Sequence, residues 1–100
     1  MAVRDAVFRD NKALSRFELE IEGESDAGGG VVIADYRRRD AIADIRHVET
    51  PVALQGKGLA TRLMDEIAAY ATAEGLKIRL TCPFAAAYFA ARPELQALRA

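Results

Sequence analysis

Two glycines flank a lysine where an extended segment gives way to a long helical pattern. The first N–H groups of a helix have no partners within it, and its dipole adds partial positive charge there. Gly56 and Gly58 remove side chains that would keep an anion away from this backbone, and Lys57 adds a cation. The pattern is typical of a phosphate or pyrophosphate site. A strand-to-helix turn without a ligand has the same pattern and is the alternative.

The glycine segment differs from two other phosphate loops. It is too short for the G-x-x-x-x-G-K-[ST] loop of nucleoside triphosphatases, and it lacks the third glycine of the dinucleotide motif G-x-G-x-x-G. A nucleotide-hydrolysing or dinucleotide-binding protein is therefore disfavoured.

Cys82, His47 and Glu49 have side chains that suit acyl and proton transfer. Cys82 follows a short predicted strand, and ligands of open sheets commonly collect at strand ends. Its thiol is either a nucleophile that accepts an acyl group or a small buried apolar group. His47 and Glu49, two residues apart on a strand, point to one face, where either could accept the proton of an amine. Otherwise His47 is a partly buried strand residue and Glu49 a solvated strand end.

The first half of the chain must supply strands that carry these residues. Alternating apolar and charged side chains predict a half-buried strand over residues 15–22, with Phe17 inward and Glu18 outward. A weaker strand is expected over residues 3–8, with a turn at Asn11 and Lys12. Further strands are predicted over residues 31–38 and 41–49. Turns at 23–30 and 39–40 join them into a meander.

The second half begins with a helical pattern after the glycine segment. Leu59, Leu63, Ile67 and Ala71 recur every four residues, and Gly75 is a suitable helix end. A strand at 77–81 follows, so strand, helix and strand form a crossover between parallel strands. A short helix over 84–91 and a last turn at 94–98 complete the prediction. The fold class is therefore α+β, in one domain over residues 1–100.

The composition excludes several classes of protein. One cysteine and one histidine exclude an internal disulfide and a His-pair metal site, so no metal is expected. The net charge of −1 and the absence of aromatic residues among the three arginines at 37–39 argue against nucleic-acid binding. The arginine run is interpreted as a solvated face. No apolar stretch is long enough to span a bilayer or resembles an export signal, so a cytoplasmic protein is expected. A monomer is compatible with all of this.

Several segments of the chain together resemble one known family. The segment Gln55-Gly56-Lys57-Gly58-Leu59-Ala60 matches Q/R-x-x-G-x-G/A, the pyrophosphate motif of the GNAT acetyltransferase superfamily. The resemblance extends over residues 15–98, through His47-Val48-Glu49-Thr50-Pro51, Gly75-Leu76-Lys77, Thr81-Cys82-Pro83-Phe84 and Arg92-Pro93-Glu94. It is strongest for small single-domain acetyltransferase-like proteins of the YjdJ-type branch.

The resemblance implies acetyl-CoA as ligand and a GNAT-like fold. Such a fold has a mixed, largely antiparallel sheet, one long crossover helix and a short C-terminal helix. The pantetheine arm would enter a gap beside the strand before the motif and pair with extended backbone at 50–54. The pyrophosphate would bind the amides of residues 55–60, and Thr61 would offer a hydroxyl. The implied cofactor-binding residues are Thr50, Val52, Leu54, Gln55, Gly56, Lys57, Gly58, Leu59, Ala60 and Thr61.

The resemblance also suggests a role for Tyr88 and marks two departures. Many superfamily members place a tyrosine near this position to protonate the departing thiolate; packing beside Phe84 and Phe89 is the alternative. Many members have Arg at the position of Gln55, so this chain has one cationic phosphate partner fewer. Many also have His at the position of Arg92.

The leading hypothesis is an acetyltransferase that moves acetyl from acetyl-CoA to an amine, with a protein or other large acceptor among the candidates. Cys82 would act as a transient acyl carrier or as a wall of the thioester pocket, and Glu49 or His47 as the base. The alternative is a non-catalytic module that binds CoA or acetyl-CoA, since so short a chain leaves little for an acceptor pocket.

Overall fold

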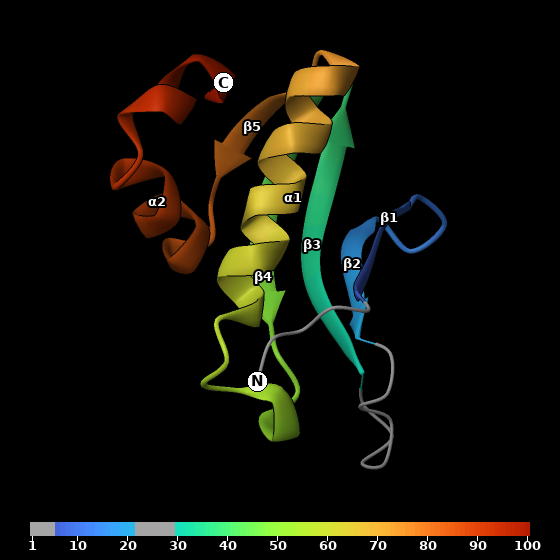
Figure 1. Ribbon diagram of the computed structural model, residues 1–100. Helices are drawn as coiled ribbons and strands as arrows, with labels where there is room; N and C mark the ends of the chain where they lie inside the picture. The colour runs from blue at the N-terminus through green and yellow to red at the C-terminus, as the bar shows by residue number, and fades with distance from the viewer. Residues whose placement is uncertain (1–5, 22–29) are drawn as a thin grey trace.

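Five strands form one sheet in the order β1-β2-β3-β4-β5 in the computed structural model, which describes residues 6–21 and 30–100 (Figure 1). The first four neighbouring strands pair antiparallel, and β5 pairs parallel with β4. The strand bounds are β1 Ala6–Asn11, β2 Arg16–Ile21, β3 Val31–Arg39, β4 Ile42–Glu49 and β5 Lys77–Leu80. The largely antiparallel sheet and the parallel strand after the crossover confirm the predicted α+β class.

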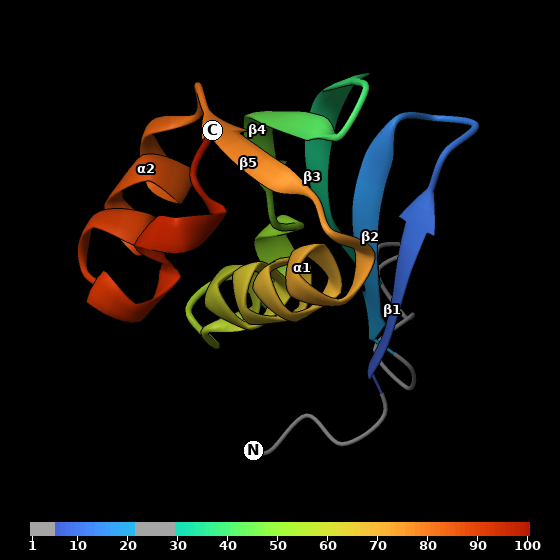
Figure 2. The same cartoon turned by 90° about the horizontal axis from the view of Figure 1, so that it is seen from above.

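One long helix and three shorter helical elements accompany the sheet. Helix α1 covers one face, whereas α2 and η2 lie beside the β5 edge (Figure 2). Within the described residues, no helix covers the other face of the sheet. Their bounds are η1 Val52–Leu54, α1 Leu59–Glu74, α2 Pro83–Ala90 and η2 Pro93–Leu98. None of the helices described is both long and apolar enough to cross a membrane.

The core lies between α1 and the sheet, as the apolar spacing requires. Leu63, Ile67 and Ala71 are fully buried on α1, opposite the buried side chains of Phe17 and Leu19 on β2. Gly75 ends the helix in the left-handed conformation, with φ of 71°. The Leu76 amide donates to the carbonyl of Ala71 at 2.9 Å, which closes the last turn. The predicted helix and its glycine stop are confirmed.

The first hairpin differs from the sequence prediction. Asn11 belongs to β1, and the turn covers residues 12–15, so the turn expected at Asn11 and Lys12 begins one residue later. Ser15 has a φ of 52°, which takes it out of the strand predicted to begin there. The Asn11 carbonyl and side-chain oxygen both accept from the Leu14 amide at 3.2 Å, and these bonds stabilise the turn. The start of the strand predicted at 3–8, Glu22 and the turn predicted at 23–30 lie largely outside the described residues.

A bulge explains the irregular apolar pattern of β4. Asp35 of β3 pairs with His47 and Tyr36 pairs with Ile45, so Arg46 is one residue more than the partner strand can match. An extra residue shifts the alternation of inward and outward side chains by one position. Ala43 and Ile45 are therefore buried before the bulge, whereas Val48 packs against the core after it.

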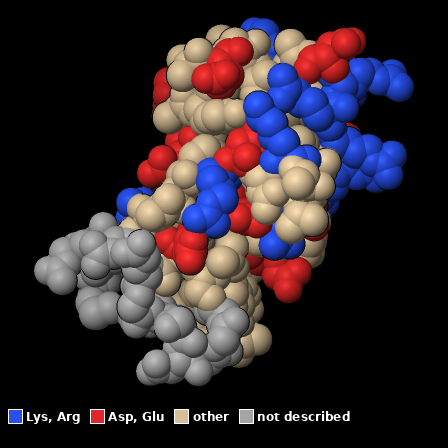
Figure 3. Space-filling model, turned by 90° about the vertical axis from the view of Figure 1, so that its right-hand side faces the viewer, with Lys and Arg blue, Asp and Glu red and all other residues tan. Residues whose placement is uncertain are grey.

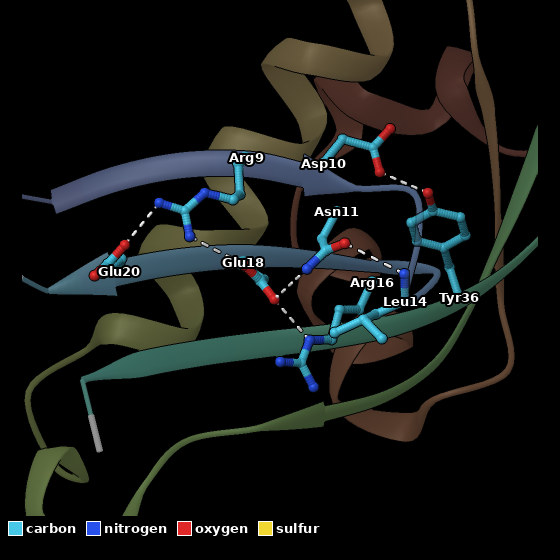
Figure 4. A network of polar contacts seen from close by, with 8 residues as sticks. All are labelled: Arg9, Asp10, Asn11, Leu14, Arg16, Glu18, Glu20 and Tyr36. Carbon is cyan, nitrogen blue, oxygen red and sulfur yellow. Dashed lines mark hydrogen bonds and ion pairs between the residues drawn. The ribbon is translucent and has the colours of Figure 1, made fainter. Parts of the chain in front are cut away.

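Glu18, predicted to face solvent, is instead 4% exposed on the uncovered face of the sheet. Its carboxylate accepts from Arg16 at 2.7 Å, from Asn11 at 3.0 Å and from Arg9 at 3.2 Å (Figure 4). Arg9 also pairs with Glu20 at 2.6 Å. Long arginine side chains from neighbouring positions thus cover a carboxylate that strand alternation assigns to water.

Replacing Glu18 by Gln is expected to lower the free energy of unfolding by about 1–3 kcal/mol, because charged hydrogen bonds are lost at a buried site. Burial would raise the pKa of Glu18, but the hydrogen bonds from Arg16, Asn11 and Arg9 outweigh it and lower the pKa below 4.5. The stabilisation that this carboxylate provides is therefore complete above about pH 4.5. It is lost as the pH falls through the lower pKa that Glu18 has in the folded protein. Urea unfolding at pH 7 and at pH 3 tests this, since the difference between wild type and variant should shrink at pH 3. An equal difference in unfolding free energy between wild type and variant at pH 7 and at pH 3 would contradict this prediction.

Asp10 connects β1 to both β3 and α1. It accepts from the Tyr36 hydroxyl at 2.5 Å and from the Tyr70 hydroxyl at 2.8 Å. Burial, followed by the bond to Asp10, raises the pKa of Tyr70 to about 12 and that of Tyr36 further. Both hydroxyls therefore stay protonated near neutral pH and hold the helix against the sheet edge.

Candidate functional site

The start of α1 has the features of an anion site. Gly56 and Gly58 adopt left-handed φ values of 81° and 74°, a conformation that favours glycine. Gly58 is the N-cap, and its carbonyl accepts the first helical bond, from the Arg62 amide at 3.0 Å. Among the residues described, no side chain caps this end, and the first turn has no acidic residue. The amides of the first turn and the positive end of the dipole are thus left for an external partner.

A hollow of about 180 Å³ opens at this helix end. It brings together eight of the ten residues predicted to bind the cofactor; Val52, which is 84% exposed, and Lys57 lie outside its lining. Phe84, at the start of α2, contributes one wall and was not predicted as a site residue. Its position in Thr81-Cys82-Pro83-Phe84, directly after the Cys82 candidate, was the available signal. The lining residues are Thr50, Leu54, Gln55, Gly56, Gly58, Leu59, Ala60, Thr61 and Phe84.

The segment expected to pair with pantetheine as extended backbone is folded differently. Val52–Leu54 forms the 3₁₀ turn η1, in which the Leu54 amide donates to the Pro51 carbonyl at 2.8 Å and the Gln55 amide to the Val52 carbonyl at 3.2 Å. Leu54 is 1% exposed, and its burial in the core fixes the turn. The Leu54 and Gln55 amides are therefore engaged, and the prediction of a pairing strand at 50–54 is wrong for this part of the chain.

The gap between strands lies instead at the end of β4. The β4–β5 ladder ends at Ile45 and Leu80, and the Ile45 carbonyl then accepts from both Thr81, at 3.0 Å, and Cys82, at 2.9 Å. These two hydrogen bonds accompany a turn of the chain away from the sheet and into α2, while β4 continues to Glu49 (Figure 1). Among the described residues, no strand pairs with the β5 side of residues 46–49. The gap opens toward Thr50, which lines the hollow.

His47 and Glu49 point to one face, as predicted. His47 Nε2 lies 3.2 Å from Glu49 Oε1, and the two side chains are 58% and 64% exposed. They pair across the sheet with Asp35 and Ile33 of β3, which places them on the face that α1 does not cover. An imidazole and a carboxylate in contact beside a strand gap can receive a proton from an approaching amine.

Cys82 is a core residue in this structure. It is the N-cap of α2, with Pro83 in the first turn, and it is 5% exposed within the apolar cluster. Its carbonyl accepts from the Ala86 amide at 2.9 Å, as the helix requires. Cys82 is not among the residues that line the hollow, so this arrangement favours the interpretation as a small buried side chain.

Tyr88 connects α2 to α1. Its hydroxyl donates to Asp65 Oδ1 at 2.5 Å, and the Arg92 guanidinium lies 3.7 Å from the centre of its ring. Burial, followed by the bond to Asp65, raises the pKa of the Tyr88 hydroxyl well above its usual range. The side chain is 6% exposed and packs beside Phe89, as the alternative interpretation expected. Its proton is committed to Asp65 rather than directed to the hollow.

The helix start suits a phosphate or pyrophosphate group. Two left-handed glycines, an uncapped first turn without acidic residues and a small hollow suit a compact anion held by backbone amides. A Cβ on Gly56 or Gly58 would meet no protein atom within 4 Å, so the space beside both residues is open to a ligand.

Comparisons with known proteins identify the family and agree with the fold. Residues 16–98 match the family described as GCN5-related N-acetyl-transferase. No curated protein sequence matches the chain. The NMR solution structure of a GCN5-like protein from Staphylococcus aureus is similar in fold, with a TM-score of 0.66 and 19% identity over 100% of this chain and 91% of that one. The chain therefore belongs to the GCN5-related N-acetyltransferase family.

Proposed function

We propose that this protein transfers an acetyl group from acetyl-CoA to an amine. The observation that carries the proposal is the uncapped start of α1, with its two left-handed glycines, next to the gap where β4 and β5 separate. An anion site that adjoins a gap between two strands suits a ligand with a charged end and a long polar arm. The similarity to the YjdJ-type branch and a cytoplasmic location stay predictions.

The residues of the glycine segment would bind the charged end of acetyl-CoA. Amides from Gly56 to Ala60 would donate to the pyrophosphate, since the Gln55 amide, also expected there, is engaged by the Val52 carbonyl. The Thr61 hydroxyl would be a further donor and Lys57 a nearby cation. The pantetheine arm would lie along the β5 side of residues 46–49 and pass Thr50. This follows from the ladder that ends at Ile45 and Leu80, and it replaces the pairing expected at residues 50–54.

Glu49 would act as the base. Glu49 is the last residue of β4 and precedes Thr50, which lines the hollow. His47 lies two residues earlier on the same strand and is therefore further from the hollow. Glu49 would take a proton from the acceptor ammonium, and His47 would hold the carboxylate through the 3.2 Å contact. Acetyl-CoA supplies an acyl thioester. The amine nitrogen forms a bond to the carbonyl carbon and the carbon–sulfur bond breaks. The nitrogen then loses its second proton, which the leaving thiolate takes.

Isothermal calorimetry and turnover test the proposal together. Acetyl-CoA and CoA should bind the full chain, and a panel of amines and lysine peptides should include one that is acetylated. Binding without transfer to any amine would favour the alternative of a non-catalytic CoA module. No binding of either ligand would contradict both functions.

Cys82 would form a wall near the thioester rather than carry the acyl group, since it is 5% exposed. The Cys82→Ala variant should then keep its turnover, and wild type incubated with acetyl-CoA should show no acetyl adduct by intact mass. An adduct on Cys82 together with loss of turnover in the variant would establish the acyl-enzyme route instead.

Replacing Tyr88 by Phe is expected to lower stability by about 1 kcal/mol and to change kcat by less than about twofold, because the hydroxyl is bound to Asp65. Thermal unfolding and steady-state kinetics on the same preparation separate the two effects. A fall in kcat of tenfold or more at unchanged acetyl-CoA affinity would instead assign Tyr88 as the acid that protonates the thiolate.

A further inference from the structure

We propose a second ligand site on this chain, for the phosphate group of a small molecule, in a hollow of arginines at the opposite end of the sheet from the glycine segment. The hollow measures about 270 Å³, larger than the one at the start of α1. It is lined by Arg37, Arg38, Arg39, Ile42, Asp44 and Arg79. We refer to it as the arginine hollow.

Strand register brings the arginines together from two segments far apart in the sequence. Arg37 of β3 pairs with Asp44 of β4, and Asp44 pairs with Arg79 of β5, so these three side chains form one row on the uncovered face. Arg39 lies two residues beyond Arg37, opposite Ile42. In Figure 3, basic side chains gather at the upper right, toward the end where β3 and β4 are joined. The sequence alone showed only the run at 37–39, because Arg79 joins it through the parallel pairing.

The one carboxylate of the hollow is already engaged. Asp44 Oδ1 accepts from the Thr81 hydroxyl at 2.7 Å, and Asp44 Oδ2 lies 3.5 Å from the Arg46 guanidinium. Within the described part of the chain, Arg37, Arg39 and Arg79 make no hydrogen bond or ion pair through their guanidinium groups. Their positive charges are thus left for a partner from outside.

The remainder of the same face is arranged differently. Arg9 pairs with both Glu18 and Glu20, and Arg16 pairs with Glu18. Neighbouring like charges destabilise a sheet, so four arginines around a single carboxylate, Asp44, cost stability. Among the described residues that line the hollow, positive charges outnumber negative ones, which is the arrangement that a bound anion would balance.

The lining selects the kind of anion. Several guanidinium groups around one hollow match a phosphate, whose oxygens accept in a bidentate manner from more than one arginine. The volume is below the ~300 Å³ at which ordinary small-molecule pockets begin, which favours a compact group. The Asp44 carboxylate and the absence of aromatic side chains from the lining disfavour a nucleic acid, which needs a longer basic track and stacking platforms.

Titration of the full-length chain with inorganic phosphate, at ionic strength held constant with chloride, tests the site by ¹⁵N NMR. We expect saturable shifts centred on the Nε–H groups of Arg37, Arg39 and Arg79. The double variant Arg37→Gln/Arg79→Gln should weaken phosphate binding by about tenfold or more. Asp44→Asn should strengthen it, because a negative charge leaves the hollow while the side-chain oxygen can still accept from Thr81.

Lys12→Gln is the matched control, since it removes a positive charge from an exposed turn outside the hollow. Its phosphate affinity should stay within about twofold of wild type. Equal weakening in Lys12→Gln, or shifts that never saturate, would overturn the site. If the double variant does not fold, Arg39→Gln alone gives the same comparison.

Two further experiments distinguish this site from the acetyl-CoA site and from a nucleic-acid site. Gly58→Ala should keep its phosphate shifts in the arginine hollow whatever its affinity for acetyl-CoA, so either site can fail without the other. Displacement of phosphate from the arginines by CoA in wild type but not in Gly58→Ala would make the hollow part of the CoA site and overturn the proposal. Tighter binding of a duplex oligonucleotide than of phosphate, lost in the double variant, would also overturn it.

Discussion

Glu49→Gln is expected to reduce kcat/KM for acetyl transfer by about 10²–10⁴-fold, the range that a general base contributes. The amide has nearly the same shape as the carboxylate but cannot take a proton from the acceptor ammonium. Glu49 is 64% exposed and outside the lining of the hollow, so acetyl-CoA affinity should stay within about twofold. Steady-state kinetics and calorimetry on one preparation measure both quantities.

Two companion variants make the result specific. Glu74→Gln removes a carboxylate at the other end of α1 and should leave turnover unchanged. His47→Gln should lower turnover less than Glu49→Gln, because His47 acts by positioning Glu49 through a contact of 3.2 Å. If Glu49→Gln retains wild-type turnover while His47→Gln abolishes it, the base is His47 and the assignment is reversed.

Gly58→Ala is expected to weaken acetyl-CoA binding by about 10–100-fold, the loss of one or two charged hydrogen bonds. The φ of 74° is unfavourable for alanine by about 1–2 kcal/mol, so the loop should relax and move its amides. The added methyl would also occupy space that is open in the protein and that the pyrophosphate would need. Calorimetry with CoA reports the loss directly.

Gly75→Ala provides a control with the same backbone strain. Gly75 has a φ of 71°, its Cβ would also meet no atom within 4 Å, and it ends the same helix at the far end from the hollow. Both variants should lower the unfolding free energy by about 1–2 kcal/mol, but only Gly58→Ala should lose affinity. Equal loss of affinity in both would mean that helix stability, and not the phosphate site, controls binding.

The two sites proposed here occupy opposite ends of one sheet and use different chemistry. The glycine segment offers backbone amides and a helix dipole, whereas the arginine hollow offers guanidinium groups from β3 and β5. The face between them carries His47 and Glu49 and is covered by no described helix. An acceptor that approaches from this face would meet the base first, and the arginine hollow would lie along the same surface.

Features that depend on local pattern could be predicted from the amino-acid sequence. Alternation predicted β2 and β3, four-residue spacing predicted α1, and Gly75 predicted its end, because each requires only a strand or helix with one apolar face. The glycine segment also predicted an anion site at the start of α1, since amides without partners are a property of any helix start. Turns and the strand–helix–strand order predicted the meander and the parallel crossover, and the family resemblance implied the same fold.

Which side chains are accessible and which distant segments meet depends on tertiary packing, and local pattern does not predict it. Strand alternation assigned Glu18 to water, but arginines on adjacent positions and strands cover it. The sequence predicts Cys82 and Tyr88 as catalytic candidates, but it does not show that core packing buries Cys82 or that the Tyr88 hydroxyl donates to Asp65. The bulge at Arg46, the end of the ladder at Ile45 and the meeting of Arg79 with Arg37 depend on pairing between distant segments. Such register is set by the fit of the whole sheet against α1, and no local pattern encodes it.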